Sequence, residues 1–238
     1  MNIIVVKNEA EVVEKLKQEI EQRSEEALKT RGVFRLGLSG GSLVSYLSSA
    51  LESIKSSDLD KWQFFFCDER FVPDTDGDST YGVYKTALIP KTTLKEKQFV
   101  WIDLSGSVEN CAEDYEKKIL KEFSMEKASV PRFDLLLLGM GPDGHTCSLF
   151  PGHALLEEHH KLIASIDDSP KPPPKRITMT LPLINNASCC IFAMCGEGKA
   201  DMVKRVFVDK ESLPAGMVKP TNGDLLCILD EAAGKYVK

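Results

Sequence analysis

The chain has 238 residues, and we expect them to form a single domain over residues 1–238. Hydrophobic residues make up 42% of the sequence, enough for a sizeable core, and charged residues make up 28%. The formal net charge of −6 argues against a nucleic-acid partner, because phosphate backbones select basic surfaces. An anionic small molecule is still allowed if positive charges gather locally.

The seven cysteines include no CxxC pair, and several lie in apolar runs such as ASCCIFAMC. This pattern indicates reduced, mostly buried thiols. The N-terminal sequence MNIIVVKNEAEVVEKL places charges directly after a short apolar run, so we expect no signal peptide. No stretch approaches the roughly 20 apolar residues of a membrane helix. We therefore expect a cytoplasmic protein without a membrane partner.

In the first half of the chain, strand and helix patterns alternate. A helix is predicted to begin after Asn8, with Glu11 three residues on as in a capping box. The other predicted helices cover residues 43–53 and 108–123, the predicted strands cover residues 33–38, 62–67 and 99–102, and a polar loop covers residues 68–79.

In the second half, FDLLLL at residues 133–138 gives the strongest strand pattern. The segment PKPPPK at residues 170–175 predicts a stiff surface loop. Further strands are predicted over residues 162–166, 176–180, 188–194 and 225–229, and further helices over residues 181–186 and 199–207. The alternation predicts an α/β fold, a single Rossmann-like domain with a largely parallel central sheet flanked by helices.

Three strong strands end in polar sequences, and in open parallel sheets ligands bind beyond the carboxyl ends of the strands. In the first, LGLSGGS, the strand leads through Ser39, Gly40 and Gly41 directly into a helix. Glycines allow a close approach to an anion, and the free N–H groups of a helix N-terminus favour phosphate. The alternative is a tight turn in which Ser42 caps the helix.

The second strand end is FFFCDERFVP, in which Asp68, Glu69 and Arg70 follow an apolar strand. One interpretation is an anion-binding Arg70 with acidic neighbours that orient it or bind sugar hydroxyls. The other is a solvated turn with a surface ion pair, which contributes little stability.

The third strand end is GMGPDGH, residues 139–145, which literally matches the dinucleotide-binding pattern GxGxxG. Pro142 removes a backbone donor, and no clean βαβ unit follows, so we favour a turn that presents Asp143 and His145. An imidazole there suits general acid–base chemistry, although a lone histidine is more often structural. The nearby Cys147 has no base fixed beside it by the sequence.

Two further basic residues are candidates for anion binding. Arg176 starts the strand RITMT, and Lys199 follows GEG at the predicted start of a helix, where a lysine gains nothing from the macrodipole. For both, a solvated surface cation is the commoner alternative. No HExxH or Cys/His spacing is present, so we predict no metal site.

The ordered motifs LGLSGGS, FFCDERFVP, GMGPDGHTCSLFPG, SPKPPPKRITMTLPLIN and GEGK resemble the 6-phosphogluconolactonases, most closely the eukaryotic cytosolic type. Their wider superfamily, that of the glucosamine-6-phosphate isomerases, includes deaminases with a related DGH segment. The resemblance implies hydrolysis of 6-phospho-D-glucono-1,5-lactone without cofactor or metal, and His145 as the base. It also implies a substrate-binding role for Ser39, Gly40, Gly41, Arg70, Arg176 and Lys199.

Within this hypothesis, Asp68 or Glu69 positions Arg70, and Asp143 sets the tautomer of His145. One departure is visible, because many relatives have Ser-Asn-Tyr where this chain has Ser79-Thr80-Tyr81. We expect a monomer whose partner is a small sugar-phosphate lactone. The alternatives are a deaminase or isomerase of amino-sugar phosphates, a sugar-phosphate sensor without catalysis, and a dinucleotide-dependent oxidoreductase.

Overall fold

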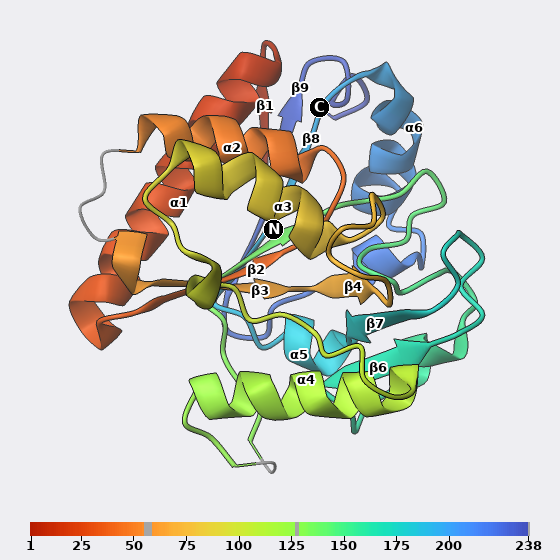
Figure 1. The fold of residues 1–238 in the computed structure, drawn as a ribbon. Helices are drawn as coiled ribbons and strands as arrows, with labels where there is room; N and C mark the ends of the chain where they lie inside the picture. Colours follow the sequence, from red (N-terminus) through yellow and green to blue (C-terminus); the bar gives the residue numbers. More distant parts are fainter. Residues whose placement is uncertain (55–58, 127–128, 238) are drawn as a thin grey trace.

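The computed structural model describes residues 1–54, 59–126 and 129–237. Its centre is a six-stranded parallel sheet with the strand order β1-β9-β8-β5-β2-β3 (Figure 1). The strands are β1 (Asn2–Val6), β2 (Phe34–Leu38), β3 (Trp62–Phe66), β5 (Leu135–Leu138), β8 (Cys189–Met194) and β9 (Asp224–Asp230). The predicted α/β fold with a largely parallel sheet flanked by helices is confirmed.

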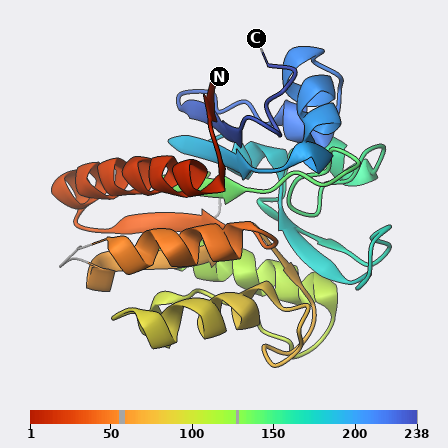
Figure 2. The ribbon, with the colours of Figure 1, turned by 90° about the horizontal axis from the view of Figure 1, so that it is seen from above.

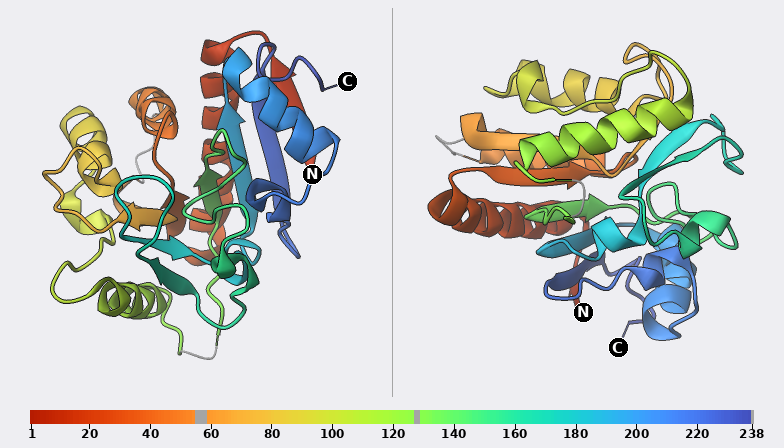
Figure 3. Two further views of the ribbon diagram at one scale, coloured as in Figure 1. Left: turned by 90° about the vertical axis from the view of Figure 1, so that its right-hand side faces the viewer. Right: turned by 90° about the horizontal axis from the view of Figure 1, so that it is seen from below.

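Helices cover both faces of this sheet, and each face has its own hydrophobic core. One face carries α1 (Glu9–Arg31), α2 (Leu43–Ser53) and α3 (Thr80–Leu88), which lie side by side in Figure 2. The other carries α4 (Val108–Glu122), α5 (Leu181–Ile184) and α6 (Ala200–Val203). In Figure 3, left, α1 and α6 lie on opposite sides of β8 and β9.

The alternation of side chains along β5 links the two cores. Leu136 and Leu138 belong to the core under α4, and Leu135 and Leu137 belong to the core under α1 and α2. All four side chains are fully buried, as expected of a parallel strand that is covered on both faces. The cysteines agree with the prediction of reduced, mostly buried thiols, since all seven are free and six of them are buried.

At the start of α1, one of the two hydrogen bonds of the predicted capping box is confirmed and the other has a different donor. The Asn8 side chain accepts a hydrogen bond from the Glu11 N–H at 3.0 Å. The Glu11 carboxylate accepts from the N–H of Lys7, at 3.1 Å, rather than from that of Asn8. No helix among the described residues is long and apolar enough to cross a membrane.

A second, antiparallel sheet adjoins the carboxyl end of the main sheet, with the strand order β4-β7-β6. It consists of β4 (Asp68–Arg70), β6 (Ile163–Ile166) and β7 (Arg176–Met179). The prediction of a loop over residues 68–79 was therefore wrong at its start. Pairing of Arg70 with Arg176 and of Asp68 with Thr178 brings two separate sequence motifs together.

One other prediction of local structure needs correction, and two elements were not predicted. Residues 99–102 form no strand, because only Phe99 bridges to Phe64. The two rings stack with centroids 4.7 Å apart, so the apolar run reflects packing rather than strand pairing. The strand β1 and the helix α3 were not predicted. Of these, β1 lies at the edge of the sheet, where among the described strands it pairs with β9 alone.

The helix α3 depends on a carboxylate from a different element. Glu69 is fully buried, and its carboxylate accepts hydrogen bonds from the backbone N–H groups of Thr80 and Tyr81, both at 2.7 Å, at the start of α3. Burial raises the pKa of Glu69 to about 7, although these hydrogen bonds oppose the rise. Glu69 therefore fastens the first turn of α3 to β4 and acts as a structural acid.

The tight packing of α3 gives a stability prediction. A Cβ on Gly82 would lie 2.0 Å from the carbonyl oxygen of Asp74. Alanine normally stabilises a helix interior by up to about 1 kcal/mol relative to glycine. We expect Gly82→Ala to lower the free energy of unfolding by about 1–3 kcal/mol instead, because backbone must move. Urea denaturation measures the change.

The matched control is Gly77→Ala, since a Cβ on Gly77 meets nothing within 4 Å. This variant should unfold at the same urea concentration as the wild type. If Gly82→Ala is as stable as the wild type, the contact between Gly82 and the Asp74 carbonyl is looser than 2.0 Å from a Cβ implies.

Candidate active site

A pocket of about 180 Å³ opens at the carboxyl ends of the adjacent strands β8, β5 and β2. Turns that follow these strands form one wall, and the second sheet forms the other. The lining residues are Ser39, Gly40, Gly41, Ser42, Leu43, Asp68, Arg70, Gly139, Met140, Gly141, His145, Cys147, Arg176, Ala193, Met194 and Lys199. The pocket thus contains every candidate residue named from the sequence except Glu69 and Asp143.

The glycine turn after β2 presents the N-terminus of α2 to the pocket. Gly41 has a φ of +77°, and the Tyr84 hydroxyl donates to the carbonyl oxygen of Ser39 at 2.8 Å. Ser42 occupies the cap position, but its side chain makes no capping hydrogen bond. The first N–H groups of a helix have no acceptor within the helix, so here they are available to an anion.

The departure from the usual Ser-Asn-Tyr sequence lies next to this turn. Thr80 is buried at the first position of α3, and its Oγ1 would lie 3.5 Å from a Cβ placed on Gly40. Its N–H donates to Glu69. Thr80 therefore supports the back of the glycine turn.

The GMGPDGH segment folds into a turn that presents His145. The N–H of Gly141 donates to the His145 carbonyl at 2.9 Å, and Gly144 has a φ of +83°. A Cβ on Gly141 would lie 2.0 Å from His145 Cε1. The imidazole therefore rests directly on the backbone at Gly141, and the Phe150 ring lies 4.8 Å from its centroid.

Asp143 fixes the orientation of the imidazole. Its Oδ1 lies 2.5 Å from His145 Nδ1. Although burial alone would raise it, the pKa of Asp143 is lowered to about 2 by hydrogen bonds from His145 and Lys171. A carboxylate at this distance requires a hydrogen on Nδ1, which leaves a lone pair on Nε2. Burial lowers the pKa of His145, against the charge of Asp143, which favours the neutral ring.

Lys171, which no sequence motif singled out, lies beside this pair. Its Nζ is 3.1 Å from Asp143 Oδ1 and 3.1 Å from His145 Nδ1. Lys171 belongs to PKPPPK, a segment predicted to be a surface loop. The composition of that segment contains no signal for an active-site residue.

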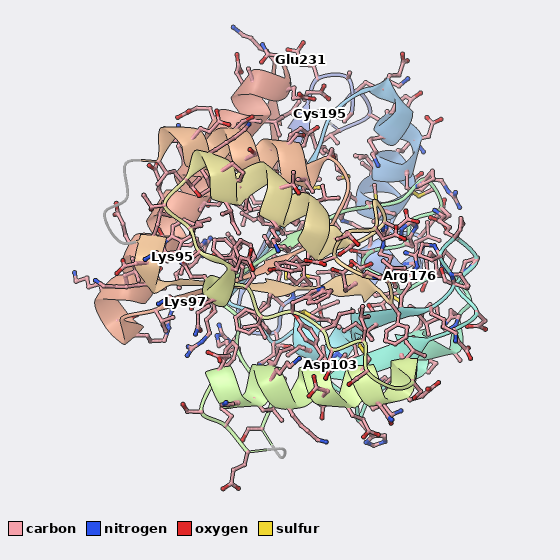
Figure 4. All side chains as sticks on the ribbon, viewed as in Figure 1. Lys95, Lys97, Asp103, Arg176, Cys195 and Glu231 are labelled. Carbon is pink, nitrogen blue, oxygen red and sulfur yellow. The ribbon has the colours of Figure 1, made fainter. Side chains whose placement is uncertain are left out.

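Arg176 holds the proline segment in place. Its side chain is buried at the start of β7 (Figure 4), and Nε donates to the Pro173 carbonyl at 2.9 Å. Nη2 donates to the carbonyl oxygens of Lys171 and Pro172, both at 2.9 Å. Burial, and then the charge of Arg70, lower the pKa of Arg176. Most donors of this guanidinium are therefore occupied by the loop.

Arg70 is positioned differently from the expectation. Its Nη1 donates to the carbonyl oxygen of Asp78 at 2.9 Å. Asp68 accepts from the Ser148 hydroxyl at 2.8 Å, and Glu69 binds the start of α3. Within the described part of the chain, neither acid pairs with the Arg70 guanidinium, and Arg70 Nε has no hydrogen-bond partner.

The last cation of the pocket is Lys199, which precedes α6. Its Nζ donates to the carbonyl oxygen of Met140 at 2.7 Å. Burial, followed by the charge of Lys171, lowers the pKa of Lys199. Cys147 also lines the pocket, but hydrogen bonding to Cys67 and burial raise the pKa of its thiol. A thiol of this kind is a poor nucleophile.

The charges of the lining residues favour an anion. Arg70, Arg176 and Lys199 carry three positive charges against the single negative charge of Asp68, although the whole chain has a net charge of −6. Among the described residues, no cluster of three or more His, Cys, Asp or Glu side chains could hold a metal ion. The arrangement places a neutral imidazole beside a wall whose charges favour an anion, which is chemically suited to general-base catalysis on an anionic substrate.

Comparison with known proteins places the chain in a family. Residues 7–227 match the family described as "Glucosamine-6-phosphate isomerases/6-phosphogluconolactonase". A "6-phosphogluconolactonase" of Rattus norvegicus is 48% identical over 241 residues, which cover 99% of this chain and 93% of the rat protein. The corresponding protein of Homo sapiens is 49% identical over 213 residues, 87% of this chain and 82% of the human protein.

Solved structures agree with the sequence relatives. The structure titled "6-phosphogluconolactonase from Trypanosoma cruzi" superposes with a TM-score of 0.85 at 28% identity, covering 100% of this chain and 97% of that one. A Trypanosoma brucei structure, at 23% identity, shares the fold with a TM-score of 0.85 and covers 100% of this chain and 98% of its own. The chain therefore belongs to the glucosamine-6-phosphate isomerase/6-phosphogluconolactonase family.

Proposed function

We propose that this protein hydrolyses 6-phospho-D-glucono-1,5-lactone to 6-phospho-D-gluconate, with His145 as the general base. One observation carries the proposal: a histidine with its Nε2 lone pair free lies in the same pocket as three cations and a helix N-terminus. The names of the 48% and 49% identical relatives support the choice of substrate.

The phosphate is the remote anchor in this proposal. A phosphate monoester carries close to two negative charges at neutral pH, which matches the net charge of two on the pocket wall. The N–H groups at Gly41 and Ser42, together with Arg70, Arg176 and Lys199, supply the donors. Binding energy from the phosphate then orients the lactone carbonyl, so that the reacting atoms meet with little further loss of entropy.

The chemical step begins when His145 Nε2 takes a proton from water. The oxygen of that water attacks the lactone carbonyl carbon, and the π-electron pair moves onto the carbonyl oxygen. Collapse of this intermediate breaks the bond from carbon to the ring oxygen, which receives the proton from Nε2. The new carboxylic acid then ionises. A donor near the carbonyl, such as Ser39 Oγ, stabilises the oxyanion.

Three other functions compete with this one. A deaminase or isomerase acting on amino-sugar phosphates would use the same fold and anion site, and release of ammonia from glucosamine 6-phosphate would identify it. A sensor would bind the lactone without accelerating its opening. A dinucleotide-dependent oxidoreductase, suggested only by GxGxxG, would bind NAD(P) in a titration.

We also propose that the chain is one domain and acts as a cytosolic monomer. Its exposed large apolar side chains are spread over several segments of the described chain, which favours the monomer; they are Met1, Val5, Val83, Val130, Val208 and Tyr236. Light scattering at active concentrations tests the oligomeric state.

The central prediction concerns His145→Ala. Loss of a general base should lower kcat by about 10²–10⁴-fold with little change in KM, because the phosphate contacts remain. Lactone hydrolysis is followed with the uncatalysed reaction subtracted. The exposed His160 provides the control, since His160→Ala should leave kcat unchanged. Near-normal turnover of His145→Ala would exclude this base.

A second prediction separates binding from chemistry. Lys199→Ala removes a charged donor from the pocket wall and should raise KM about 10–100-fold, with a smaller effect on kcat. The control is Lys204→Ala, because Lys204 is exposed and pairs with Asp209. Steady-state kinetics of both variants give the comparison. A drop in kcat alone would place Lys199 at the reacting carbonyl.

The state of His145 predicts a pH dependence. Burial lowers the pKa of His145 below the usual 6.5 of histidine, and the neutral ring is the active form. The value of kcat/KM should therefore fall as the pH decreases, with a midpoint below 6.5. A pH profile of the free enzyme from kcat/KM measures this midpoint. A midpoint above 6.5 would mean that another group controls the acid side.

A further inference from the structure

Lys171 reaches the catalytic pair from a segment 26 residues away in sequence. Its ammonium contacts both the Asp143 carboxylate and His145 Nδ1 at 3.1 Å, so that three groups meet around one point. Because the Nδ1 hydrogen is directed at Asp143, the ammonium donates to the carboxylate and lies beside the ring as a positive charge.

The fold holds this lysine in place through its backbone. The Lys171 carbonyl accepts from Arg176 Nη2 at 2.9 Å and from the Ser169 hydroxyl at 2.8 Å. The Lys171 N–H donates to the same hydroxyl at 3.2 Å. In addition, the buried Arg176 binds three successive carbonyl groups of this loop. A solvated surface loop does not require such contacts, so they indicate that the loop is held in one conformation.

The charges around His145 explain what the ammonium does. Asp143 and Asp68 favour protonation of the ring, and Lys171 opposes it. The cations that line the pocket come from three other places, which are Arg70 on β4, Arg176 on β7 and Lys199 before α6. Lys171, in contrast, contacts the ring nitrogen directly. It therefore counterbalances the carboxylate that orients the ring.

We propose that Lys171 is a positioning residue for the reaction: its ammonium holds Asp143 in place against His145 Nδ1 and offsets the tendency of that carboxylate to protonate the ring. The proposal rests on the proposed function, since it assumes that neutral His145 is the base. An aspartate alone would orient the imidazole, but it would also stabilise the protonated ring. A smaller fraction of the histidine would then be neutral and able to accept a proton near neutral pH. The lysine separates these two effects.

The first test is the pH profile of lactone hydrolysis. Lys171→Met should move the acid limb of kcat/KM to higher pH, so that its fold loss is larger at pH 6 than at pH 8. Asp143→Asn should move the limb to lower pH and also lower kcat, because the ring tautomer is no longer fixed. Lys171→Arg keeps the charge and should stay closer to the wild-type midpoint than the methionine variant.

The matched control is Lys175→Met, which removes the same charge from an exposed position in the same loop. The backbone contact of Lys175, from its carbonyl to the Phe71 N–H, does not involve the side chain. This control should keep the wild-type profile. The proposal is overturned if Lys171→Met has the wild-type midpoint. It is also overturned if Lys171→Arg and Lys171→Met shift the midpoint by the same amount.

An NMR titration of His145 makes the test independent of turnover. The ring ¹⁵N signals are assigned by their loss in His145→Ala and followed with pH in the wild type, Lys171→Met and Lys175→Met. Protonation at higher pH in Lys171→Met alone supports the proposal, and identical titrations overturn it. A wild type that fails to hydrolyse the lactone would remove the proposed function, yet this titration would still decide the role of Lys171.

Discussion

The antiparallel pairing of β4 with β7 is the constraint on which the site depends. It places Arg70 opposite Arg176, two like charges in register. This arrangement is tolerated because carbonyl oxygens of Asp78 and the proline segment accept from the two guanidinium groups, and Asp68 adds a negative charge. Without the pairing, the parallel strands would end in glycine turns with no facing wall. The pocket forms between the two sheets rather than within either.

Much of the fold could be predicted because its strands have strong local patterns. The four leucines of β5 and the aromatic run of β3 are buried on both faces, which requires continuous apolar sequence. The elements that were missed depend on distant partners. β4 is three residues long and exists through pairing with β7, and α3 begins where Glu69 accepts its first N–H groups. Phe99 gave a strand pattern because it packs on Phe64.

The candidate site was predictable where motifs follow strands, since parallel strands deliver their carboxyl ends to one edge. Ser39, His145 and Lys199 meet in the pocket for this reason. The roles of the arginines were harder to predict. A sequence cannot show that Arg176 uses its donors on the backbone of residues 171–173, and this contact is what turns a proline-rich segment toward the pocket. Lys171 was missed because nothing local distinguishes it from Lys175.

The contact between Gly141 and His145 has a consequence for variation within the family. The position of Gly141 is closed to any other residue by the imidazole, which would lie 2.0 Å from its Cβ, and its φ is not in the left-handed region. The restriction on this glycine therefore comes from side chains two and four residues away, since Asp143 Oδ1 would also lie 2.8 Å from that Cβ. Loss of the histidine would remove the two closest of these contacts, so the glycine is expected to be retained wherever the histidine is retained.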